Sequence, residues 1–146
     1  MAIVARVPDL DRSRLRRLRG PLGAAGAVGV AALALHVRDP HQRSSWGFCP
    51  FKALSGWDCP ACGSLRAVND LGHGQLAEAA HSNLLLVASI PLLVAVWALW
   101  ARRSWTGRSW RPPAGVVPPL AIACTALMIA FTIYRNTPWG SAWYAG

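Results

Sequence analysis

Three long apolar segments, separated by polar ones, dominate the chain. Apolar side chains run almost without interruption over residues 21–37, 84–101 and 114–134. A helix that crosses a bilayer needs about 20 such residues, with roughly 17 to 25 tolerated. The pattern therefore predicts three transmembrane helices. The second is expected to start already at about Leu76, because the residues that follow Leu76 are good helix formers.

The composition supports this interpretation. Of the 146 residues, 53% are hydrophobic and 14% are charged, whereas an ordinary soluble domain has about 25% charged residues. Too little polar sequence remains to cover three apolar helices. We predict an all-α membrane protein, with residues 21–146 forming one membrane domain. Its expected architecture is a bundle of three transmembrane helices plus a short interfacial helix at about 63–71.

The charged residues predict an orientation in the membrane. The N-terminal segment 1–20 contains six arginines, and the loop 102–113 contains four arginines and no acid. Short arginine-rich segments remain in the cytoplasm. Residues 38–83 carry four basic and four acidic side chains, and residues 135–146 carry one arginine. We therefore predict a multi-pass protein of the cell membrane, with the N-terminus inside and the 38–83 and 135–146 segments outside.

The net charge of +9 also raises the question of the partner. The arginine clusters flank apolar segments, where they suit anionic lipid headgroups. The expected partner is therefore the lipid bilayer and not nucleic acid. Acidic residues are absent from the three apolar segments, so ion transport by this chain alone is not expected.

The first apolar segment has a second interpretation. Basic residues, an apolar stretch and Ala32-Leu33-Ala34 together resemble a signal peptide with its cleavage site. The apolar run continues past that site to Val37, which favours a retained helix. In both cases the following segment lies outside the cytoplasm.

Cysteines concentrate in the external segment. Cys49, Cys59 and Cys62 fall within fourteen residues, and Pro60 follows Cys59. Thiols outside the cytoplasm tend to oxidise, and three of them form one disulfide and leave one thiol. The first hypothesis is a disulfide of undetermined pairing that staples a docking loop in a non-enzymatic accessory or interaction protein. Cys124, inside the third apolar segment, is expected to be a small buried apolar residue.

The second hypothesis is thiol–disulfide exchange by Cys59 and Cys62, with another membrane protein or a thioredoxin-like protein as partner. In a C-x-x-C arrangement one thiolate attacks and its neighbour resolves the mixed disulfide. A helix at 63–71 would place Cys59 just before its N-terminus, where peptide dipoles favour a thiolate. Such an activity would make the protein a thiol–disulfide oxidoreductase. No βαβ pattern surrounds the motif, so the chain is not a thioredoxin domain.

The third hypothesis is a zinc-stapled loop; apart from the zinc of this hypothesis, no cofactor is expected. Cys49, Cys59 and Cys62 together with His73 would form a Cys₃His ligand set. The intervening spacings of nine, two and ten residues are permissible but not distinctive. His73 lies between two glycines, which is also typical of a solvated turn.

The cysteine motif resembles the bacterial DUF2752 family, small membrane proteins of uncharacterised function with a C-P-x-C-G-x-T-R signature. The resemblance spans about residues 46–138. Leu65 stands where the family usually has threonine, and Leu84 where proline is common, so no role of that threonine hydroxyl is carried over. The matching residues are Cys49-Pro50-Phe51, Ser55-Gly56, Cys59-Pro60-Ala61-Cys62-Gly63, Arg66-Ala67, Gly74, Asn83 and Tyr134-Arg135-Asn136.

Polar residues near the predicted helix ends complete the candidate site. Arg66 would bind loop carbonyls, favour a thiolate or bind a lipid phosphate, or else reach the interface as a snorkelling side chain. Arg135 is expected to end the third helix and anchor it at the headgroups. Asn69, Asn83 and Asn136 are expected to satisfy backbone groups where helices break.

Overall fold

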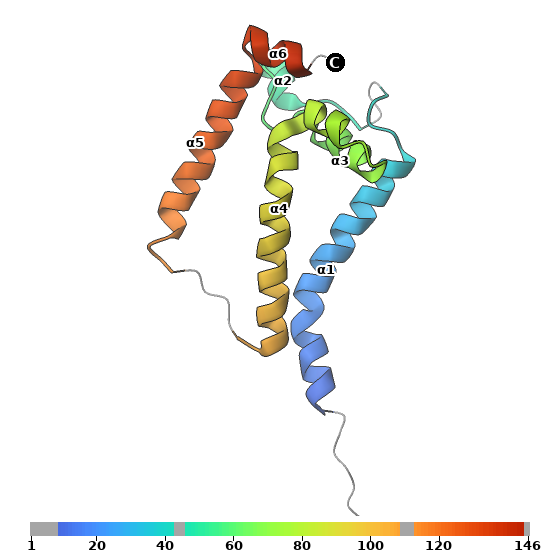
Figure 1. Ribbon diagram of the computed structural model, residues 1–146, viewed down its shortest axis with the longest axis vertical. Helices are drawn as coiled ribbons and strands as arrows, with labels where there is room; N and C mark the ends of the chain where they lie inside the picture. Colours follow the sequence, from blue (N-terminus) through green and yellow to red (C-terminus); the bar gives the residue numbers. More distant parts are fainter. Residues whose placement is uncertain (1–8, 43–45, 109–112, 145–146) are drawn as a thin grey trace, which may run out of the picture. The chain divides into compact units, whose positions relative to one another are not determined.

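The computed structural model describes residues 9–42, 46–108 and 113–144, and every regular element in these ranges is a helix (Figure 1). This confirms the all-α prediction. Residues 1–8 and 109–112 of the two predicted basic regions lie outside the described ranges, as does Arg43. The helices are α1 (Asp9–Val37), α2 (Pro50–Ser55), α3 (Ser64–Gly72), α4 (Leu76–Thr106), α5 (Val117–Arg135) and α6 (Pro138–Tyr144).

Three helices are long and apolar enough to cross a membrane. The candidate spans are Arg14–Val37, Leu76–Thr106 and Val117–Arg135. Within each of these helices, the protein itself buries only 11%, 0% and 0%, respectively, of the most apolar stretch of 18 residues. Apolar helices with so little protein cover indicate a multi-pass membrane protein surrounded by lipid. The predicted start near Leu76 is confirmed, and the predicted short helix at 63–71 is found as α3.

Helix α4 is interrupted at Asn83. This residue has φ −160° and ψ 94°, outside the helical region. Its side-chain Oδ1 accepts a hydrogen bond from the Leu86 amide at 2.9 Å, which caps the helical segment that follows. Pro91 lies further along α4 and keeps helical angles. The local break therefore comes from a capping asparagine and precedes the main apolar run.

The chain divides into two compact units. The first combines α1 up to Gly29 with α4 from Pro91 onward. Here the Trp97 indole donates to the Pro21 carbonyl at 3.0 Å. A Cβ on Gly20 would lie 3.0 Å from the ring of Trp100. Two tryptophans of α4 thus pack against the part of α1 that contains Gly20 and Pro21.

The second unit contains Val30–Ile90 together with α5 and α6, and includes all three clustered cysteines. Its interior is unusually polar. Asn69 donates to the Leu35 carbonyl at 2.7 Å, which ties α3 to the end of α1. Asp70 is 2% exposed, pairs with His41 at 2.8 Å and accepts from Ser82 at 2.8 Å. Specific hydrogen bonds, more than apolar packing, fix this unit.

Candidate functional site

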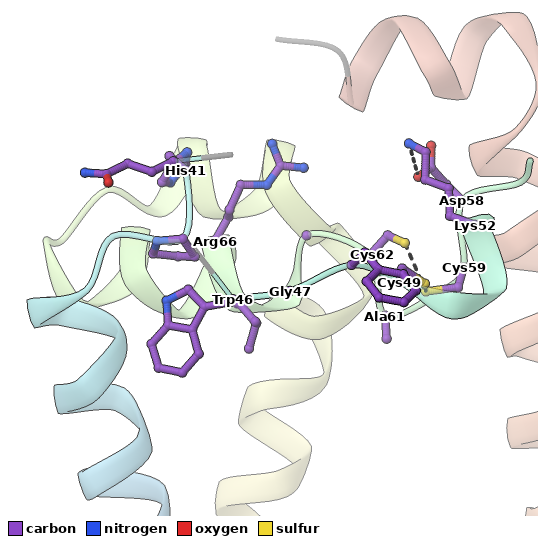
Figure 2. A pocket seen from close by; sticks show the side chains of 15 residues that line it. His41, Trp46, Gly47, Cys49, Lys52, Asp58, Cys59, Ala61, Cys62 and Arg66 are labelled. Carbon is purple, nitrogen blue, oxygen red and sulfur yellow. Dashed lines mark hydrogen bonds and ion pairs between the residues drawn. The ribbon is translucent and has the colours of Figure 1, made fainter. Parts of the chain in front are cut away.

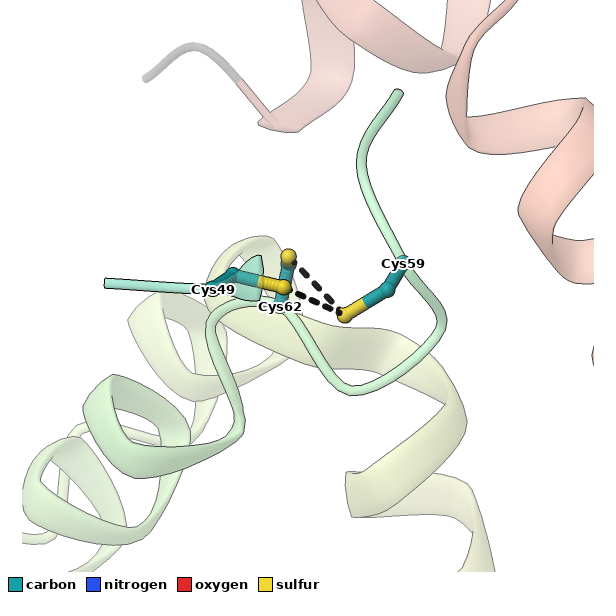
Figure 3. A group of neighbouring side chains, drawn as sticks. All are labelled: Cys49, Cys59 and Cys62. Atoms are coloured by element: carbon teal, nitrogen blue, oxygen red, sulfur yellow. Dashed lines mark hydrogen bonds between the residues drawn. The ribbon is translucent and has the colours of Figure 1, made fainter. Parts of the chain in front are cut away.

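Three cysteine side chains converge in the second unit (Figure 3). Cys59 Sγ lies 3.0 Å from Cys62 Sγ and 3.5 Å from Cys49 Sγ. All three sulfur atoms lie within 4.8 Å of one another. They are free thiols, close but not bonded. The sequence motif thus forms one cluster, and Cys59 is the member that contacts both others.

Local backbone structure brings the thiols together. Cys49 precedes α2, and Pro50 occupies the first helical position, where proline is well tolerated. The Cys62 amide donates to the Cys59 carbonyl at 3.0 Å and closes the turn between them. Gly63 then has φ +80°, and a Cβ there would collide with the Ser82 carbonyl. Only glycine allows this turn to approach α4 so closely.

Asn83 holds the cysteine turn from the side of α4. Asn83 is only 1% exposed. Its side-chain Nδ2 lies 2.9 Å from the Pro60 carbonyl, 3.1 Å from the Cys62 carbonyl and 3.1 Å from the Ser64 hydroxyl. Asn83 thus lies at the break in α4 and bonds to backbone groups on both sides of it. One amide group caps α4 and positions the C-x-x-C turn at the same time.

Asn136 holds the same segment from the side of α5. Its Oδ1 accepts from the Asp58 amide at 2.9 Å, and its Nδ2 donates to the Asp58 carbonyl at 2.9 Å. The Nδ2 group also donates to the Thr132 carbonyl at 2.8 Å. Asn136 therefore bonds to backbone groups at the end of α5 and in the cysteine segment. The residue before Cys59 is fixed at both backbone groups to the end of a candidate span.

The two outer thiols differ in acidity. Backbone amides, that of Lys52 most of all, lower the pKa of the Cys49 thiol. Burial, followed by the hydrogen bond with Cys59, raises the pKa of Cys62 to about 12. Of the two, Cys49 is therefore the thiol that ionises more readily, whereas Cys62 remains protonated at neutral pH. The sequence did not predict α2, so it gave no reason to expect an acidic thiol at Cys49.

The cluster lines a cavity of about 470 Å³. Figure 2 shows the thiols in its wall, with Trp46 and Arg66 in another part of the lining. The Lys52 ammonium pairs with the Asp58 carboxylate at 2.8 Å beside the thiols. Arg66 is half-buried and shares the cavity with Cys62. The thiols are thus accessible to a ligand or to a reactive group of a partner.

His73 is not part of the cluster. Its ring stacks on His36 with centroids 4.2 Å apart, and its Nδ1 lies 2.8 Å from the Asn69 carbonyl. It lines a second cavity together with His41 and Asp70. The reason is geometric, because Cys62 precedes α3 whereas His73 follows it. The predicted fourth zinc ligand is therefore wrong.

Arg135 is buried, which corrects its predicted position at the headgroups. It is 3% exposed, and its guanidinium carbon lies 4.3 Å from the centre of the Tyr144 ring. Its Nε and Nη1 have no hydrogen-bond partner among the described residues. Helix α6 folds back over it, and Gly140 permits this because a Cβ there would collide with the Tyr134 carbonyl. Cys124 is exposed on α5, so the prediction that it is buried is also wrong.

Comparison with known proteins places the site within one family model. No curated protein and no solved structure matches the chain. The matched part of the family model contains the three cysteines, Gly63, Arg66 and Asn83, but ends before Arg135 and Asn136. Residues 49–97 match the family described as "Protein of unknown function (DUF2752)", which confirms the family resemblance that the cysteine motif indicates.

Proposed function

We propose that this chain is a membrane-anchored thiol–disulfide exchange protein that uses Cys49, Cys59 and Cys62. The observation that supports this proposal is the position of Cys59, whose sulfur lies 3.0 Å from one thiol and 3.5 Å from another. A disulfide that only staples a loop needs one pair and gains nothing from a third thiol nearby. A thiol relay needs a central sulfur that can bond to either neighbour in turn.

The proposed relay exchanges one disulfide of the cluster for another. Starting from a Cys49–Cys59 disulfide, the small fraction of Cys62 that has lost its proton to solvent attacks the sulfur of Cys59. The Cys59–Cys62 bond forms, the Cys49–Cys59 bond breaks, and Cys49 leaves as a thiolate. This direction is favoured because the lowered pKa of Cys49 makes it the better leaving group. No electrons are gained or lost in this internal step.

Net oxidation or reduction requires a partner protein that carries a dithiol or a disulfide. A thiolate of the partner attacks the disulfide of the cluster and forms a mixed disulfide. The second thiol of the partner then attacks and releases the cluster. The partner dithiol loses two electrons and becomes a disulfide, while the cluster disulfide gains them and becomes two thiols. The reverse sequence reduces a partner disulfide.

We further propose that the cluster faces away from the cytoplasm, with the N-terminus inside. The support is the arginine asymmetry between the segments that flank the spans. Alkylation of intact cells with a membrane-impermeant thiol reagent, with and without reductant, tests this orientation and the oxidation state together. Labelling of the cluster only after permeabilisation would contradict the proposed side.

Trapping of mixed disulfides tests the exchange activity. Cys59→Ser should abolish covalent partner complexes on non-reducing gels, because it removes the sulfur shared by both pairs. Cys62→Ser should increase them several-fold, because it removes the resolving thiol. Cys124→Ser is the matched control and should leave trapping unchanged. If neither Cys59→Ser nor Cys62→Ser alters trapping, exchange is excluded and a permanent staple in an accessory protein is favoured.

Metal binding is a second candidate, supported by the mutual distances of all three sulfur atoms, which lie within 4.8 Å. Three thiolates form a ligand set for zinc or another thiophilic cation, with one coordination position left open. Metal analysis of protein purified under reducing conditions tests this candidate. One zinc per chain that is lost in Cys49→Ser would support it, and the absence of stoichiometric metal would reject it.

A further inference from the structure

We infer that α2 and its flanking aromatic residues form a surface that inserts into the lipid interface at the cysteine-bearing end of the spans. None of the residues of α2 is buried. Phe48 is 82% exposed and Leu54 is 91% exposed, and Phe51 and Trp57 are about half exposed. These four side chains recur at every third position of a short segment. Apolar groups this exposed require a covering partner.

Two hydrogen-bonded clamps, each formed by one asparagine, fix the position of this segment relative to the apolar runs of α4 and α5. Asp58 is held through both backbone groups by Asn136, the residue that directly follows α5. Pro60 and Cys62 are held by Asn83, which directly precedes the apolar run of α4. The residue that follows α5 and the residue that precedes the apolar run of α4 therefore hold the residues that follow α2. At this level a spanning helix leaves the hydrocarbon layer, and aromatic side chains are enriched there.

The chemistry of the surface favours lipid as its occupant. Exposed Phe51, Leu54 and Trp57 accompany an ion pair between Lys52 and Asp58. Apolar and charged side chains combined in one short helical segment suit the boundary between headgroups and acyl chains. Helix α6, which follows α5, carries a further exposed aromatic side chain, because Trp139 is 82% exposed. Exposed aromatic side chains thus occur both in the α2 segment and in the helix that contacts the end of α5.

This inference goes beyond the proposed thiol chemistry and does not depend on it. It concerns the location of the cavity, because Phe48 and Cys49 are neighbours and both line it. Insertion of Phe48 and α2 would place the opening of the cavity at the membrane surface. Any ligand or partner would then approach the thiols along the bilayer.

Quenching by brominated lipids tests the inference on the full chain in lipid nanodiscs. A fluorescent amino acid is introduced separately at Leu54, at Ile129 within α5 and at Glu78 on the exposed start of α4. Bromine atoms are placed at shallow positions of the acyl chains. We expect the label at position 54 to be quenched at least half as strongly as that at 129, and the label at 78 to be quenched only weakly. Position 54 is 91% exposed, so the label displaces no packed side chain.

Two outcomes would overturn the inference. If the label at 54 is quenched as weakly as the label at 78, the surface faces water. If it is shielded from both brominated lipid and aqueous iodide, a protein surface covers α2. The label at 129 serves as the positive control for insertion, and thiol alkylation verifies that the cluster is intact in each labelled protein.

Discussion

Cys49 and Cys62 contact the same sulfur but have opposite surroundings. Cys49 lies beside the backbone amides of Phe51 and Lys52, which stabilise a negative charge. Cys62 is more deeply buried, and desolvation disfavours its charged form. Two residues of the same type thus differ in reactivity because their local surroundings differ. The asymmetry gives the proposed relay its direction.

The rate of alkylation should reveal this difference between the two thiols. Only the thiolate reacts, so its rate rises as the pH passes the pKa of the group. On the reduced protein, Cys49 should reach half of its maximal rate below pH 9.0, the ordinary pKa of a thiol, whereas Cys62 should remain slow until the pH approaches about 12. Mass spectrometry of peptides after timed alkylation measures both. Coinciding profiles for the two cysteines would contradict the asymmetry.

Arg135 and His73 show where prediction from sequence stops at the residue scale. The three cysteines could be identified as one site because they are close in sequence. The burial of Arg135 could not, because it depends on α6 folding back over α5. The same holds for His73, whose neighbour His36 lies far away in sequence. A local motif identifies the site residues that are close in sequence. Residues that reach the site through contacts between distant segments cannot be identified in this way.

At the scale of elements, the three long helices and the short helix α3 were predictable, whereas the two shortest helices were not. Length and hydropathy are sufficient for α1, α4 and α5, since each contains enough apolar residues to span a bilayer. Helices α2 and α6 have 6 and 7 residues, which is too short for a helical periodicity to emerge. Segments this short are stable mainly through contacts with the rest of the protein. The clamp between Asp58 and Asn136 is one such contact.

The cysteine turn packs so closely against α4 that a side chain at position 63 should destabilise the protein. Replacement of Gly63 by Ala should lower stability by about 1–3 kcal/mol through backbone strain alone, and further because the new Cβ meets the Ser82 carbonyl. The matched control is Gly74→Ala, since Gly74 has φ +74° but nothing within 4 Å.

Thermal unfolding of both variants in detergent checks this prediction. The midpoint of Gly63→Ala should fall clearly below that of Gly74→Ala, and its cluster thiols should react faster with alkylating reagents. Equal midpoints would mean that the close approach to α4 contributes nothing to stability.

At the scale of the whole molecule, the described residues enclose very little apolar interior. Apart from Pro21, the buried hydrophobic residues of the described chain are Leu35, Ala67 and Ala79, whereas the three candidate spans remain almost entirely uncovered. A large apolar side chain left in water forgoes about 1.5–3 kcal/mol. Summed over three helices, this loss far exceeds the usual stability of about 5–15 kcal/mol of a folded domain.

The protein should therefore depend on lipid or detergent to remain dispersed. Purification in detergent should give a single species, and removal of the detergent should cause aggregation. Size-exclusion chromatography with light scattering measures both states, and reconstitution into nanodiscs should restore a monodisperse sample. A monodisperse chain in detergent-free buffer would contradict the membrane assignment.

An odd number of sulfhydryls in one cluster has a consequence of its own. Bridging consumes these groups two at a time, so a single one survives after the first oxidation. A surviving sulfhydryl can be capped reversibly by a small molecule such as glutathione. Bridged, capped and fully reduced chains would then differ in mass and would be distinguishable as three separate forms of the same protein.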